Sequence, residues 1–142
     1  MHKIDRDSKI LNITHTDLDG VGCTILLNKV FSDVECISVG YDQVDGVILN
    51  TNPEDYDYIF VTDVRFPNEI DQLVATLHDK CKFVSIRIDR PMDRSDIQNE
   101  HESEKGLDDY DDWSIKVKND RTMTELSLDA IEVVEYLLRL KK

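Results

Sequence analysis

The pattern of apolar and polar residues at the start of the chain is typical of a strand followed by a helix. Residues 9–14 contain three closely spaced apolar side chains, which indicates a short buried strand. A polar stretch follows and ends at Gly20, and apolar residues then recur at helical spacing over 20–31. The pattern therefore predicts a strand, a tight turn and a helix.

Strands and helices are predicted to alternate along the rest of the chain. The sequence predicts strands near 34–39, 58–62 and 82–88 and helices near 68–78 and 125–140, while residues 41–50 are ambiguous. The last helix carries an apolar stripe that we expect to be buried, made of Leu128, Ile131, Val134, Leu137 and Leu138. Alternation of this kind predicts an α/β fold in three layers, with a mainly parallel sheet flanked by helices.

The length of 142 residues predicts a single domain over residues 1–142. Residues 90–112 are rich in carboxylates and poor in apolar side chains, which predicts an acidic surface loop. Trp113–Val117 is expected to be a short strand or a packing anchor after this loop.

The formal net charge of −13 argues against a general nucleic-acid-binding or membrane-binding surface, since both favour Lys and Arg. Either metal ions supply positive charge at a nucleic-acid site, or the acidity itself is offered to a basic partner. Three cysteines without metal-ligand spacing indicate free thiols in a reducing compartment. We expect no signal peptide and no membrane span, and a cytoplasmic location.

Several residues at the predicted strand ends are suited to metal chemistry. His15, Asp17 and Asp19 alternate along the chain, so their side chains can point to one side. Asp63 and Asp89 follow two further predicted strands, and the carboxyl ends of parallel strands meet at one edge of a sheet. Carboxylates with an imidazole suit Mn²⁺ or Mg²⁺. The alternative is a solvated turn in which aspartates cap a helix and glycine permits a positive φ.

The segment Ile13–Gly22, with its His-Thr-Asp-Leu-Asp-Gly core, resembles motif I of the DHH phosphoesterase superfamily. That superfamily includes exonucleases, oligoribonucleases, cyclic-dinucleotide phosphodiesterases and family II pyrophosphatases. Tyr58–Asp63 is similar to its motif II, and Tyr110–Trp113 resembles a segment of short DHH-like proteins encoded by bacteriophages. The resemblance implies that His15 and Asp17 hold one Mn²⁺, that Asp19 holds a second, and that Asp63 bridges the two.

The chain departs from this family at motif III, where Asp-His-His is replaced by Asp89-Arg90-Pro91. Arginine does not ligate metals, and proline has no side-chain donor. We therefore expect one bound ion rather than two, with Asp89 and Arg90 as candidate catalytic residues. Arg90 would act as a bidentate phosphate clamp, or else form a salt bridge to Asp89 or Asp93. From the sequence alone, we expect no counterpart of the substrate-binding C-terminal domain of the oligonucleotide-cleaving members.

Two functions from different classes remain open. The first is a Mn²⁺-dependent phosphodiesterase that acts on nucleotides or short single-stranded nucleic acid. The second is a catalytically degenerate acidic protein of the bacteriophage type, which binds a basic or nucleic-acid-binding host protein in the host cytoplasm. The sequence leaves the oligomeric state open.

Overall fold

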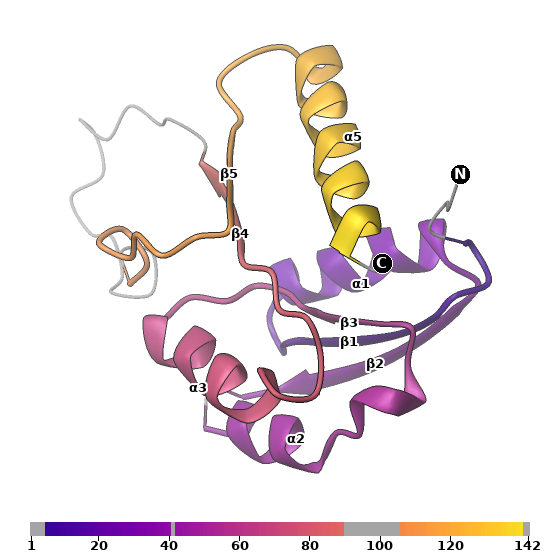
Figure 1. The fold of residues 1–142 in the computed structure, drawn as a ribbon, viewed down its shortest axis with the longest axis vertical. Helices are drawn as coiled ribbons and strands as arrows, with labels where there is room; N and C mark the ends of the chain where they lie inside the picture. Colours follow the sequence, from indigo (N-terminus) through magenta and orange to yellow (C-terminus); the bar gives the residue numbers. More distant parts are fainter. Residues whose placement is uncertain (1–4, 41, 90–105, 141–142) are drawn as a thin grey trace. The chain divides into compact units, whose positions relative to one another are not determined.

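The computed structural model describes residues 5–40, 42–89 and 106–140 (Figure 1). The chain divides into two compact units, which we call the N-terminal unit (within Ile4–Cys81) and the C-terminal unit (within Lys82–Lys142). Each unit is described separately below.

A three-stranded parallel sheet forms the centre of the N-terminal unit. Its strands are β1 (Lys9–His15), β2 (Asp33–Val39) and β3 (Tyr58–Val61), in the order β2-β1-β3. Figure 1 shows α1 (Leu18–Val30) on one face, and α2 (Val44–Asn50) and α3 (Pro67–Leu77) on the other. The short 3₁₀ helix η1 (Pro53–Asp55) precedes β3. The predicted α/β fold, with a parallel sheet between helices, is confirmed.

The central strand β1 supplies the best-buried residues of this unit. Ile10 and Leu11 are fully buried and Ile13 nearly so, because helices cover both faces of a parallel sheet. Asn12 is also fully buried, and its amide donates to the Thr24 hydroxyl (3.2 Å) while its carbonyl accepts from the Thr62 hydroxyl (3.0 Å). These hydrogen bonds offset the cost of burying the amide and tie β1 to the end of β3.

The strand order places a topological switch point at β1. The chain leaves β1 for β2 on one side, and later returns to β3 on the other side of β1. Ligands of such sheets bind beyond the carboxyl ends of the strands at this point, where the two connections diverge. In this chain it lies just after His15 and Val61.

Helix α1 begins so close to β1 that only glycine fits in its first turn. A Cβ atom at Gly20 would lie 2.1 Å from the carbonyl oxygen of His15 and 2.8 Å from Oγ1 of Thr14. Asp17 is the N-cap of this helix, and its Oδ1 accepts the Gly20 N–H (3.0 Å). Close approach, rather than a positive φ, is therefore what requires Gly20.

The C-terminal unit contains a second parallel pair of strands, β4 (Ile86–Asp89) and β5 (Ile115–Lys118). The expectation that residues 82–88 add a strand to the main sheet is wrong, since the strand begins at Ile86 and pairs with β5. Alternating apolar residues indicate an extended segment, but they do not specify its pairing partner. The strand expected at Trp113–Val117 is present as β5.

Helix α5 (Met123–Leu140) is present, but the expectation that its apolar stripe is buried is wrong. No residue of this helix is classed as buried, and Leu128 and Ile131 are 57% and 55% exposed. A helix of 18 residues is about 27 Å long, whereas the four-residue strands beside it span only about 13 Å. Two such strands cannot cover the whole stripe.

No helix within the described residues is long and apolar enough to cross a membrane.

Candidate functional site

Three carboxylates gather around one guanidinium at the switch point of the sheet. We call Asp17, Asp19 and Asp63 the carboxylate cluster. Nη2 of Arg65 contacts Oδ2 of Asp17 and lies 3.7 Å from Oδ2 of Asp19. Nε and Nη2 of Arg65 also donate to the two oxygens of Asp63, at 3.1 Å and 3.2 Å. The ends of β1 and β3 thus bring their aspartates onto one cation.

Asp63 is held in a conformation that few residues adopt. It is the only non-glycine residue among those described with a positive φ, at 61°. Aspartate tolerates this left-handed region better than most residues, because its short polar side chain can bond locally. In this turn the Asp63 carboxylate faces Arg65, two residues later in the chain, and accepts a hydrogen bond from its Nε. Local backbone geometry therefore helps to form the cluster.

The two strand-end aspartates differ in electrostatic environment. The N–H of Gly20 and the Arg65 charge lower the pKa of Asp17 below its ordinary value, with the Gly20 bond as the larger cause. Burial raises the pKa of Asp63, and Arg65 opposes that rise. Asp17 is therefore the more firmly ionised member of the pair.

His15 ends β1 beside this cluster, and its Nε2 contacts a different carboxylate. His15 and Glu69 are both 5% exposed, and Nε2 of His15 lies 3.0 Å from Oε1 of Glu69. The other Glu69 oxygen accepts the backbone N–H groups of Arg65 (2.9 Å) and Phe66 (3.0 Å). Glu69 thus connects the end of β1 to the loop that carries Arg65 and caps the start of α3.

Asp89 does not belong to the sheet edge where it was expected. It ends β4 in the C-terminal unit, and its Oδ1 accepts from Nε of Arg87 at 2.5 Å. Arg87 also donates to Asp108 (3.1 Å) and to the carbonyl of Leu107, and it lies over the ring of Trp113. Arg90, the other candidate catalytic residue, lies outside the described residues, as does Pro91.

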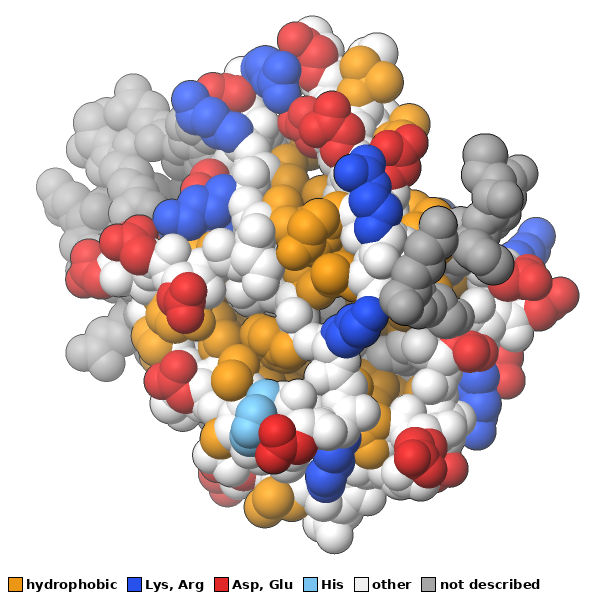
Figure 2. All heavy atoms as spheres, in the orientation of Figure 1, with side chains coloured by type: hydrophobic (Ala, Val, Ile, Leu, Met, Phe, Trp, Pro, Cys, Tyr) orange, Lys and Arg blue, Asp and Glu red, His pale blue; other side chains and the backbone are white. Residues whose placement is uncertain are grey.

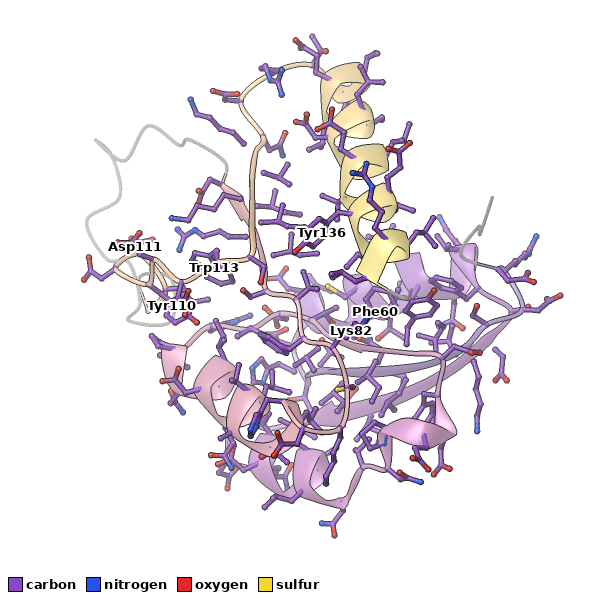
Figure 3. All side chains as sticks on the ribbon, viewed as in Figure 1. Phe60, Lys82, Tyr110, Asp111, Trp113 and Tyr136 are labelled. Atoms are coloured by element: carbon purple, nitrogen blue, oxygen red, sulfur yellow. The ribbon has the colours of Figure 1, made fainter. Side chains whose placement is uncertain are left out.

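Tyr110 and Trp113 form a packing anchor before β5 (Figure 3). Their ring centroids are 5.0 Å apart in an edge-to-face arrangement, and the Trp113 indole N–H donates to the Tyr110 carbonyl at 2.7 Å. With Arg87 over the Trp113 ring, these contacts hold the segment 107–113 against β4.

The residues around the carboxylate cluster fit a divalent cation in chemistry, although a guanidinium lies there in the structure. Mn²⁺ and Mg²⁺ favour carboxylate oxygens, and Asp17 and Asp63 bring two carboxylates to one point. Within residues 5–40, 42–89 and 106–140, no group of three or more His, Cys, Asp or Glu side chains is placed so that it could hold a metal ion. The donor set in the structure is therefore the pair of Asp17 and Asp63, with the exposed Asp19 nearby.

Two residues of the site escaped the sequence analysis. Arg65 lies in the turn between Asp63 and the helix that begins at Pro67, outside the apolar patterns that predict strands and helices. Its spacing of two residues from Asp63 is the signal that would have indicated it. Glu69 was recognisable as the third residue of a helix beginning at Pro67, the position from which a glutamate reaches back to the helix start.

Searches of family models, curated proteins and solved structures found no match to this chain. The resemblance to DHH phosphoesterases stays a prediction from the sequence motifs. Of the motif residues, Asp17, Asp19 and Asp63 lie around Arg65, and His15 contacts Glu69.

Proposed function

We propose that this chain is a DHH-like protein that binds one Mn²⁺ or Mg²⁺ ion at the carboxylate cluster. The ion would hold the phosphate of a nucleotide or a short single-stranded oligonucleotide, and the reaction would be hydrolysis of a phosphodiester. The observation that carries the proposal is the convergence of Asp17 and Asp63 on one cation at the switch point of the sheet.

Each residue of the site has a definite part in this proposal. Asp17 and Asp63 would hold the ion, and the exposed Asp19 would add a third oxygen ligand. When bound, such an ion polarises the phosphoryl group and lowers the pKa of water. Glu69 would position the site, because it fixes both His15 and the backbone before α3. With a single ion, leaving-group stabilisation is weak, so we expect slow hydrolysis.

The test is Mn²⁺ binding by calorimetry, with hydrolysis of bis-p-nitrophenyl phosphate and of short oligonucleotides measured on the same protein. Asp17→Asn removes the charge but leaves an oxygen to accept the Gly20 N–H, so it separates metal binding from helix capping. We expect this variant to lose Mn²⁺ binding and any hydrolysis. Asp71→Asn, at an exposed position on α3, is the matched control and should behave like the unaltered protein.

Two results would contradict the proposal. One is absence of Mn²⁺ binding throughout the millimolar range. The other is equal binding by Asp17→Asn and the unaltered protein, which would place any bound ion elsewhere.

A second candidate function is an acidic binding protein that targets a basic or nucleic-acid-binding host protein. The net charge of −13 favours it, because charge complementarity speeds the encounter with a basic surface. The ion pairs of Arg65 favour it too, since they partly neutralise the cluster without any bound metal. For either function we propose a cytoplasmic location, where Cys23, Cys36 and Cys81, all free thiols in the structure, would stay reduced.

A further inference from the structure

The Arg65 guanidinium is enclosed by the groups that the proposed function assigns to a metal ion. Its side chain is 16% exposed, and that of its bidentate partner Asp63 is 11% exposed. The Asp17 and Asp19 side chains are more open, at 38% and 82%. The cluster is therefore closed on the Asp63 side by Arg65 and open to solvent on the Asp19 side.

We propose that Arg65 is a built-in competitor for the divalent cation, so that metal binds only when the guanidinium leaves Asp17 and Asp63. This inference rests on the proposed function, since it concerns the same site. It adds a regulatory residue that sets how much free metal is needed to fill the site.

The chemistry of arginine makes this competition unavoidable. The guanidinium stays protonated at every physiological pH, so Arg65 cannot vacate the cluster by losing its charge. Its planar fork occupies both oxygens of Asp63, and the same Nη2 reaches Asp17. A metal ion bonded to these oxygens would occupy the space of the fork and repel its charge. Arg65 and the ion are thus mutually exclusive on this pair.

The charge balance explains why an ion can still compete. Three carboxylates surround a single guanidinium, so the cluster has more carboxylate groups than positive charges to balance them. A divalent cation balances more of the carboxylate charge than a guanidinium does, and the Asp19 carboxylate is exposed to solvent, where an ion can reach it. While Arg65 occupies the site, no ion can bind there. The apparent affinity for the ion is therefore the intrinsic affinity multiplied by the fraction of time that the site is open.

The experiment compares Mn²⁺ affinity, measured by calorimetry, in the full-length protein and in Arg65→Gln. If Arg65 closes the site about nine-tenths of the time, the variant will bind Mn²⁺ about tenfold more tightly. Arg121→Gln is the matched control, because Arg121 also pairs with carboxylates (Asp129, Glu125 and Asp120) but lies in the C-terminal unit. It removes the same charge from the chain and should leave the affinity unchanged. Adding Asp17→Asn to Arg65→Gln should abolish the gain.

The outcomes separate this inference from the proposed function. Binding that is equal or weaker in Arg65→Gln overturns the competition and leaves the metal site intact. Absence of binding in both proteins overturns both proposals. A similar gain in Arg121→Gln shows a general charge effect and overturns the competition. Arg65→Lys, which keeps the charge without the fork, should bind Mn²⁺ with intermediate affinity; this second variant decides the matter if Arg65→Gln does not fold.

Discussion

At Gly20, a single hydrogen atom in place of a methyl group allows α1 to start against the end of β1. Gly20→Ala would place a carbon 2.1 Å from the His15 carbonyl oxygen, so the helix start would have to shift. We expect the free energy of unfolding to fall by about 1–3 kcal/mol, the usual cost of overpacking. Denaturant unfolding monitored by circular dichroism measures it.

Gly22, two residues further along the same helix, is the control for that substitution. A Cβ atom there would meet nothing within 4 Å. Gly22→Ala should raise the free energy of unfolding by about 0.5–1 kcal/mol, because alanine loses less backbone entropy in a helix. Equal effects of the two substitutions would contradict the close-approach explanation.

At the residue scale, the sequence predicted that Asp17 and Asp63 lie close together. It did not predict that both contact the Arg65 guanidinium. Asp17 and Asp63 follow strands whose apolar runs are clear, so their common edge could be inferred. The Arg65 contacts depend on the positive φ of Asp63 and on hydrogen bonds from Glu69. Such turn geometry is not encoded in the periodicity of the sequence, and neither is the pairing of His15 with Glu69.

At the scale of single elements, Thr122 and Glu125 cap the start of α5 reciprocally, and Glu125 is the ionisable member of this pair. The backbone N–H and hydroxyl of Thr122 donate to Oε2 of Glu125 at 3.0 Å and 2.8 Å, and the Glu125 N–H donates to the Thr122 hydroxyl at 3.3 Å. These bonds lower the pKa of Glu125, with the backbone bond as the largest cause. Glu125 therefore stabilises α5 above its unfolded pKa of about 4.3, and this contribution is lost as the pH falls through its lower folded pKa.

We predict that Glu125→Ala lowers the free energy of local unfolding at the start of α5 at neutral pH. The substitution should have no effect at a pH where Glu125 is protonated. Hydrogen exchange of the first α5 amides, measured between neutral and strongly acidic pH in both proteins, tests it. Glu132→Ala, at an exposed position in the middle of the helix, should show no such pH-dependent difference. A constant difference at every pH would show that the Glu125 effect is packing rather than ionisation.

The elements that the sequence predicted best are those with strong periodicity. Strands β1, β2 and β3 and helices α1, α3 and α5 lie within a few residues of their expected limits. The sequence pattern of helix α2 was ambiguous because the helix has only seven residues, which is less than two full helical turns. The partner of β4 and the exposure of α5 depend on which surfaces meet in space, and one sequence alone does not specify this.

For the whole molecule, the formal net charge of −13 bears on the proposed encounter with a basic partner. Figure 2 shows Asp and Glu side chains at the surface with Lys and Arg side chains among them. If the acidic binding function holds, capture of a basic host protein should weaken steadily as salt rises through the physiological range. Affinity capture from host extract at several salt concentrations measures this, with a neutral unrelated protein as bait control. Salt-independent capture would contradict an electrostatic partner.

The hydrogen bond that the Arg65 backbone N–H donates to Glu69 has an evolutionary consequence. Glu69 accepts the backbone N–H of Arg65 at 2.9 Å. Any residue other than proline supplies the same N–H, so the turn before α3 does not depend on an arginine being there. Mutation can therefore exchange the guanidinium for a neutral or acidic group while this bond of the turn persists. If the carboxylate cluster holds a metal ion as proposed, one substitution at position 65 would open or close that site while the turn before α3 is kept.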